Sequence, residues 1–238
     1  MIHGPGENGS SNESCRRSDQ GRKMKKYMPN ILPSLLLAGV LVLGYRKLLH
    51  HDVWSGFFYN LEIVAIGIYI LWILCELGVA QRDVGHENAV KDHGTRELYG
   101  LSQFCTILSA LWFDPLWRGP GIHQLAGLIV FICGIIIRIW AIRSLGEYYS
   151  HMVRTIDQHK IIDTGPYRLL RHPAYAGMIT AHLGIVVLYF NYITLLIFAL
   201  LLVPSIIVRI FMEEKALFDI EGYADFARDR KRIIPCVW

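Results

Sequence analysis

The chain has 238 residues, of which 53% are hydrophobic and 18% charged, and its mean hydropathy is +0.34. These proportions argue against an ordinary soluble domain, in which about 25% of residues are charged. The net charge of +4 comes from polar connections between apolar segments, so anionic lipid beside a membrane protein explains it without a nucleic acid partner.

Six apolar segments recur along the chain, each close to the roughly 20 residues that a helix needs to cross a bilayer. Only helices satisfy every backbone group in lipid with such short connections. We therefore predict an all-α integral membrane protein with six transmembrane helices, five being the alternative, and the first and fifth give the weakest signals. The predicted spans are Ile31–His50, Phe57–Ala80, Leu98–Trp117, Ile122–Ile142, Ala174–Phe190 and Tyr192–Met212.

The basic residues predict the orientation of these spans. Most of the 24 Lys and Arg residues lie in the N-terminal tail, in the connections after the second and fourth spans, and in the C-terminal segment. Because basic residues concentrate on the cytoplasmic side, six spans with both termini cytoplasmic fit this pattern. Residues 1–28 are rich in Gly, Ser, Asn and charge and are expected to be a disordered cytoplasmic tail, while 29–133 hold the N-terminal transmembrane helices.

The five cysteines lack C-x-x-C spacing and fall mostly in apolar segments, so the sequence predicts neither a disulfide framework nor a metal site. Motifs that bind phosphate through a Gly-rich loop, or zinc through H-E-x-x-H, are also missing from the sequence. The chemistry must therefore come from other residue types.

The longest polar connection contains DTGPYRLLRHPAYAG, directly before the fifth span. Gly165 is expected to take a positive φ in a turn, and Pro173 suits the first turn of a helix because its missing N–H costs nothing there. A helix start flanked by Tyr167, His172 and Tyr175 offers backbone N–H groups to an anion and aromatic faces to a ring or cation, which predicts a cofactor pocket. The alternative is an interfacial belt of aromatic and basic side chains.

A second polar group, RIFMEEKALF, closes the sixth span. Arg209 and Glu213 are four residues apart and therefore lie on one helical face, with Glu214 beside them. Ionisable residues at the edge of hydrocarbon are costly unless they are paired or used, so this group indicates either a functional site or an interfacial salt bridge.

Other polar residues lie inside the apolar segments. Glu76 and Arg138 are near cytoplasmic ends and are expected to snorkel or to pair with one another, while Glu62 is a further candidate to line a cavity. His182 is interpreted as a core histidine rather than a ligand. Pro204 is expected to kink the sixth span.

The order of SLGEYYSHMV, HKIIDTGPYRLLRHPAYAG, RIFMEEKAL and EGYADFARDRKRIIP resembles the isoprenylcysteine carboxyl methyltransferase family of integral membrane enzymes and its prokaryotic relatives. The likeness runs from Gly134 to Pro235. It implies a C-terminal methyltransferase catalytic region at 134–238, with S-adenosyl-L-methionine bound on the cytoplasmic face. The membrane would be the endoplasmic reticulum in a eukaryote or the plasma membrane in a prokaryote.

The resemblance also implies roles for individual residues. Arg209 would face the methyl acceptor and Glu213 would grip the cofactor, and these two are the candidate catalytic residues. The implied cofactor-binding residues are His159, Lys160, Ile161, Ile162, Tyr167, His172, Pro173, Ala174, Tyr175 and Glu213.

The partner implied by this family is a lipophilic acceptor that enters from the bilayer, most simply the carboxylate of an isoprenylcysteine. A carboxylate, with a pKa of about 3.5, is ionised at neutral pH and needs an anchoring cation such as Arg209 more than a base or a metal. A phospholipid amine or a small thiol remains open as the acceptor, and Glu213 or His172 would then act as the base. Two further alternatives are an NADPH-dependent sterol-type reductase and a non-catalytic membrane scaffold.

Overall fold

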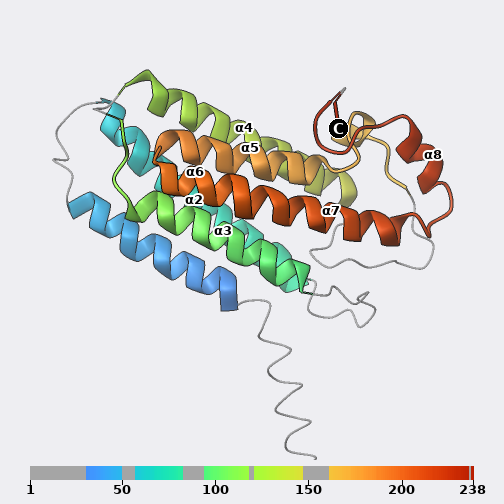
Figure 1. Ribbon diagram of the computed structural model, residues 1–238, viewed down its shortest axis with the longest axis horizontal. Coiled ribbons are helices and arrows are strands. Elements are labelled where there is room, and N and C mark those ends of the chain that lie inside the picture. Colours follow the sequence, from blue (N-terminus) through green and yellow to red (C-terminus); the bar gives the residue numbers. More distant parts are fainter. Residues whose placement is uncertain (1–30, 50–56, 83–93, 118–120, 147–160, 236) are drawn as a thin grey trace, which may run out of the picture.

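A computed structural model describes residues 31–49, 57–82, 94–117, 121–146, 161–235 and 237–238. Within these ranges the chain is helical, which confirms the predicted all-α class, and the long helices lie side by side in a bundle (Figure 1). The predicted tail, residues 1–28, lies outside the described residues. The helices are Ile31–Leu49, α2 (Phe57–Arg82), α3 (Thr95–Trp112), α4 (Ile122–Leu145), η3 (Gly165–Arg168), α5 (Pro173–Leu188), α6 (Tyr192–Ile197), η4 (Phe198–Leu202), α7 (Val203–Leu217) and α8 (Tyr223–Arg228).

Among the described residues, four helices are long and apolar enough to cross a membrane: Ile31–Leu49, Asn60–Gly78, Ile122–Leu145 and Tyr192–Leu217. The first of these had given a weak sequence signal. The other two predicted spans correspond to α3, whose hydropathy is lowered by polar side chains, and to α5, which has 16 residues. At 1.5 Å per residue α5 extends about 24 Å, less than the roughly 30 Å of hydrocarbon. By length and composition, four of the described helices are therefore candidate membrane spans, and the count of six stays a prediction.

Glycines bring the backbones of α4 and α5 into direct contact. Gly127 and Gly134 on α4 are two helical turns apart, as are Gly177 and Gly184 on α5, so each pair lies on one face. A Cβ on Gly177 would lie 2.6 Å from the backbone N of Arg138, closer than any real Cβ contact. Small residues at such positions are how membrane helices pack closely. The start of α5 is thereby held against the end of α4.

Helices α6, η4 and α7 form one continuous helix with a π-helical turn at Phe198–Leu202. In this turn the backbone N–H of Val203 donates to the carbonyl of Phe198, five residues earlier. The turn lies immediately before Pro204, which has no N–H to donate and disturbs the regular helix. The kink predicted at Pro204 stays a prediction, and beyond the π-helical turn α7 carries Arg209 and Glu214 to buried positions.

The polar residues of α3 explain why it is less hydrophobic than its neighbours. The hydroxyl oxygens of Ser102 and Ser205 lie 2.8 Å apart, and Thr194 donates to Ser109 at 3.1 Å. These bonds join α3 to α6 and α7, where both partners are buried. The polar side of α3 therefore faces the helix that carries Arg209.

Candidate functional site

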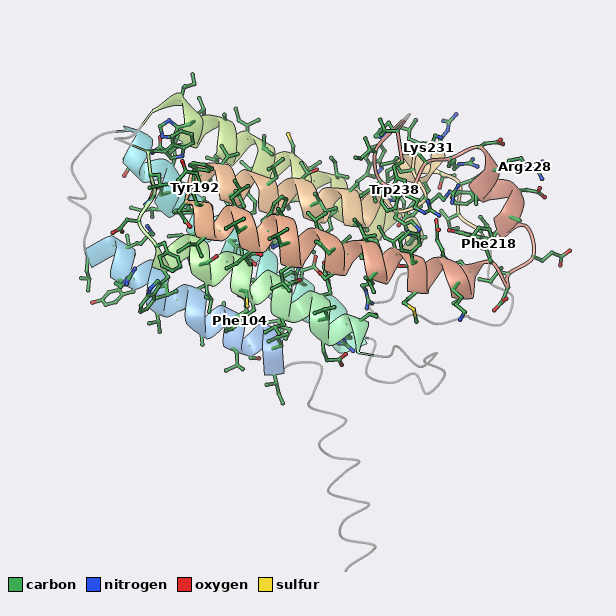
Figure 2. The ribbon with its side chains drawn as sticks, in the orientation of Figure 1. Phe104, Tyr192, Phe218, Arg228, Lys231 and Trp238 are labelled. Carbon is green, nitrogen blue, oxygen red and sulfur yellow. The ribbon has the colours of Figure 1, made fainter. Side chains whose placement is uncertain are left out.

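The polar connection before α5 and the C-terminal segment meet at one end of the bundle. Figure 2 shows Lys231 and Trp238 at this end, opposite Tyr192. A single parallel bridge pairs Leu170 with Lys231, and the backbone N–H of Arg171 donates to the carbonyl of Lys231 at 2.8 Å. The C-terminal segment is thus tied to the RHP motif by backbone bonds.

His172 is the residue that caps α5. The helix begins at Pro173, so the prediction of proline in the first turn is confirmed. The backbone N–H of the buried His172 donates to the backbone carbonyl of Arg232 at 2.9 Å. The carbonyl of His172 accepts from the backbone N–H groups of Tyr175 and Ala176, both at 3.1 Å. These bonds fix the entry of the chain into α5 and aim the imidazole at α7.

Glu214 is the centre of a buried charge cluster. Its Oε1 lies 3.0 Å from a terminal guanidinium nitrogen of Arg171 and 3.4 Å from Nε2 of His172, while its Oε2 accepts from Nε of Arg232 at 2.9 Å. The Glu214 side chain is only 4% exposed, so these partners replace water around the carboxylate. This cluster joins α5, α7 and the C-terminal segment.

Arg209 and Glu213, which the sequence placed on one helical face, both contact Tyr175. Nε of the buried Arg209 donates to the Tyr175 hydroxyl oxygen at 2.9 Å. The same hydroxyl forms a hydrogen bond with the side chain of the half-buried Glu213. The tyrosine of the RHPAY motif therefore links the two residues predicted to be catalytic.

Helix α3 contributes to the same place. Arg209 donates to the Thr95 hydroxyl at 3.5 Å, and its guanidinium carbon lies 5.9 Å from the centre of the Tyr99 ring. The rings of Tyr99 and Tyr175 meet edge to face, with centres 6.3 Å apart. No sequence pattern indicated these two α3 residues, because they lie far from the recognisable motifs.

A small apolar cluster lies beside the charge cluster. It joins Tyr167 and Ala174 with Tyr223, Phe226, Ala227 and Ala141, and the partly buried Ile161 packs against it. Gly165 has a φ of 60°, as predicted, and begins η3, which positions Tyr167. Pro173 is buried and Ile162 is half-buried, whereas His159 and Lys160 lie outside the described residues. Three of the predicted cofactor contacts therefore share one cluster.

Tyr223 stands out in this cluster because its buried hydroxyl has no hydrogen-bond partner among the described residues. Burial raises the pKa of this hydroxyl above its ordinary value, and the nearby Glu214 and Glu213 raise it further. The phenol therefore stays neutral at physiological pH, and it lies beside Tyr167 and Ala174 with an unused donor.

Replacing Tyr223→Phe is expected to raise the free energy of unfolding by about 1 kcal/mol in detergent, because an unsatisfied buried hydroxyl costs about that much. Thermal unfolding of the ligand-free protein measures the change. Tyr192→Phe, at a position that is 67% exposed, is the matched control and should leave the unfolding temperature unchanged. A lower unfolding temperature for Tyr223→Phe would show that the hydroxyl is satisfied in the folded protein.

Glu76 and Arg138 pair with one another, as predicted. Nε and a terminal nitrogen of Arg138 donate to the two carboxylate oxygens of Glu76 at 2.5 and 2.9 Å, and Trp72 donates to the same carboxylate at 3.0 Å. Arg138 also reaches the carbonyl of Ala174 at 3.4 Å. The pair therefore contacts the first turn of α5 at Ala174, close to His172.

His182 is fully buried in the core, in keeping with its interpretation as a core histidine. Its Nδ1 lies 2.9 Å from the carbonyl of Met178, and its ring packs against Trp72 and Tyr69, with centres 5.8 and 6.4 Å apart. Nε2 has no hydrogen-bond partner among the described residues, so only one of its nitrogens is satisfied. Its contacts are thus with Met178, Tyr69 and Trp72 in the core.

Two residues of the charge cluster, Arg171 and Arg232, were not singled out from the sequence, and Glu214 was grouped with Arg209 and Glu213 without being chosen as a site residue. Glu214 directly follows Glu213, which was predicted as a site residue, and only the rotation of α7 decides which of the two side chains faces the bundle. Arg171 directly precedes His172 in the RHP motif, so its position was a usable signal. Arg232 carried no signal, because its contact depends on the return of the C-terminal segment.

The fold and the site define a helical membrane protein with a charged and aromatic site at one end of its bundle. Residues 127–219 match the model of the isoprenylcysteine carboxyl methyltransferase family. The Arabidopsis thaliana protein-S-isoprenylcysteine O-methyltransferase A is 32% identical over 146 residues, which cover 58% of this chain and 74% of the plant protein. The chain therefore belongs to the isoprenylcysteine carboxyl methyltransferase family.

Three further proteins resemble this chain, one of them, YpbQ, being uncharacterized. The Bacillus subtilis protein YpbQ is 31% identical over 161 residues, 64% of this chain and 94% of YpbQ. A probable protein-S-isoprenylcysteine O-methyltransferase of Oryza sativa is 36% identical over 115 residues, 47% of this chain and 60% of the rice protein. The solved eukaryotic intramembrane Ras methyltransferase shares the fold, with a TM-score of 0.51 at 20% identity over 86% of this chain and 75% of that chain.

Proposed function

We propose that the protein is an S-adenosylmethionine-dependent methyltransferase that methylates the carboxylate of an isoprenylcysteine or a similar lipophilic acid. The observation that carries this proposal is Arg209, a buried cation on α7 at the end of the bundle where Tyr175 and Glu213 meet. A planar guanidinium can hold a carboxylate through two parallel hydrogen bonds. Arg209 is therefore suited to orient a carboxylate acceptor at this end of the bundle.

The residues present fit the proposed cofactor. Tyr167, Ala174 and Ile161 would hold its adenosine portion in the apolar cluster, and the unpartnered hydroxyl of Tyr223 would find a polar partner there. Glu213 would attract its positive charge, whereas the carboxylate of Glu214 is already surrounded by His172 and two arginines. S-Adenosylmethionine supplies an electrophilic methyl group on a sulfonium sulfur.

With this cofactor bound, its methyl group would be available for transfer to an acceptor carboxylate oxygen, with the sulfonium sulfur keeping the electron pair of the carbon–sulfur bond. No proton moves, so the chain needs no general base. Arg209 orients the carboxylate, and the buried setting removes water around it, which contributes through proximity and alignment. The cluster of Glu214, Arg171, His172 and Arg232 keeps α5 and α7 in the required arrangement.

Arg209 also bears on the alternative acceptors. A guanidinium at the acceptor position repels an ammonium group and attracts a carboxylate, which favours the acid over a phospholipid amine. A thiol would need a base to remove its proton, and Glu213 is engaged by Tyr175. The carboxylate therefore remains the first choice of acceptor.

The topology and location are part of the proposal. We place the N-terminal transmembrane helices at 29–133 and the catalytic region at 134–238, with six spans in which α3 and α5 cross within the protein-filled centre of the bundle. The site end faces the cytoplasm, so the soluble cofactor reaches it from the cytosol and the lipophilic acceptor from the bilayer. The membrane is the endoplasmic reticulum in a eukaryotic cell and the plasma membrane in a prokaryotic one.

Calorimetry with S-adenosylhomocysteine on the detergent-purified protein tests the cofactor, and a farnesylcysteine analogue tests the acceptor. We expect the wild type to bind S-adenosylhomocysteine with micromolar affinity, and Glu213→Ala to bind it about tenfold or more weakly. Arg209→Lys should bind S-adenosylhomocysteine as the wild type does, but its rate of methyl transfer should fall by about a hundredfold. Arg228→Ala, on an exposed pair with Asp225, is the silent control. A folded wild type that binds no S-adenosylhomocysteine would refute the proposal.

A further inference from the structure

Helices α3 and α5 both contact Arg209. Tyr175 on α5 accepts from its Nε at 2.9 Å, while on α3 Thr95 accepts from a terminal nitrogen at 3.5 Å and the Tyr99 ring lies under the guanidinium at 5.9 Å. Thr95, Tyr99 and Arg209 are each at least nine-tenths buried. The guanidinium is thus oriented by two hydroxyl groups and one aromatic face.

The Tyr99 ring is itself held in place. Its hydroxyl oxygen accepts from the side-chain nitrogen of Gln103 at 3.0 Å, and its plane stands at 89° to the ring of Tyr175. Gln103 lies one turn further along α3 and also contacts the sulfur of Met178 on α5 at 2.9 Å. One face of α3 therefore supports both the ring and, through it, Arg209.

These α3 residues lie outside the family-matched segment, residues 127–219, which contains Arg209 and Tyr175. From this we infer that Thr95 and Tyr99 are positioning residues that set the orientation of Arg209 toward the acceptor carboxylate. The inference rests on the proposed function. Its physical basis is that a planar guanidinium pairs well with a carboxylate only in a defined orientation, and a long side chain keeps that orientation only when its own donors are fixed.

The test compares kinetic constants and binding for Thr95→Val and Tyr99→Leu in the full-length protein. Val keeps the shape of Thr and removes its hydroxyl, and Leu removes the aromatic face. With N-acetyl-S-farnesylcysteine as acceptor, we expect the KM for the acceptor to rise about tenfold in each variant. The affinity for S-adenosylhomocysteine, measured by calorimetry, should stay within about twofold of wild type, because neither side chain lies in the apolar cluster that would hold the cofactor.

Matched variants separate positioning from packing. Thr95→Ser keeps the hydroxyl and should keep the acceptor KM of the wild type. Tyr99→Phe keeps the ring but loses the bond from Gln103, so its acceptor KM should rise less than that of Tyr99→Leu. Ser109→Ala removes a bond between α3 and α6 without touching Arg209 and should leave the acceptor KM unchanged. An unchanged KM in both Thr95→Val and Tyr99→Leu, or an equal rise in Ser109→Ala, would overturn the inference.

The proposed function can fail separately. A wild type that binds no S-adenosylhomocysteine refutes the proposed function and this inference with it. A wild type that binds the cofactor product and methylates the farnesylcysteine, with Thr95→Val and Tyr99→Leu behaving like wild type, refutes only the role of α3.

Discussion

Replacing Glu214→Gln is expected to destabilise the protein by about 3–5 kcal/mol, because it removes the one carboxylate shared by Arg171, Arg232 and His172. The two arginines, whose side chains are 16% and 27% exposed, would then lose the carboxylate that they share. The loss should appear as a fall of about 10 °C in the thermal unfolding temperature in detergent.

The neighbouring residue provides the control for this experiment. Glu213→Gln alters a half-buried side chain bonded to Tyr175, and its amide still accepts that bond, so the unfolding temperature should change by a few degrees at most. Glu213→Gln, although the less destabilised of the two variants, should bind S-adenosylhomocysteine more weakly than the wild type while it is still folded. Equal destabilisation by the two variants would contradict the division of roles between Glu213 and Glu214.

The helices were predictable because each is a long apolar segment, and apolar length is the property that bilayer thickness selects. α4 and the continuous helix from Tyr192 to Leu217 both follow this rule. α3 was predicted as the span Leu98–Trp117 although polar side chains lower its hydropathy, and two of these, Ser102 and Ser109, bond to Ser205 and Thr194. Hydropathy alone cannot register a polar group whose partner is more than 80 residues away.

The candidate site was predictable in its location and less so in its detail. The RHPAY and EEK motifs identified His172, Tyr175 and the end of α7, because they combine charge, aromatic rings and a helix start. The choice between Glu213 and Glu214 depends on the rotation of α7 after the π-helical turn at Phe198–Leu202. An added residue in a helical turn rotates everything beyond it, so the facing residue follows from the whole helix and its packing rather than from the motif.

The contact between α4 and α5 leads to the other large expected effect. Gly134→Leu should prevent formation of the native bundle, because even a Cβ at this position would overlap the backbone of Ala181 on α5. A leucine side chain would push α5 away from α4 and carry His172 and the carbonyl of Ala174 away from Arg138. Close packing tolerates no such insertion without large backbone shifts, whose cost in a core is typically 1–3 kcal/mol or more for a few added methylenes.

Gly67→Leu is the matched control, because Gly67 lies in the middle of α2 and a Cβ there would meet nothing within 4 Å. Its yield of monodisperse protein and its S-adenosylhomocysteine affinity should equal those of the wild type, whereas Gly134→Leu should give aggregated or non-binding protein. Gly134→Ala, which adds a single methyl group, should fold with a lower unfolding temperature and reduced binding. If Gly134→Leu folds and binds like the wild type, α4 and α5 do not touch at this glycine, and the site at the start of α5 is not held by α4.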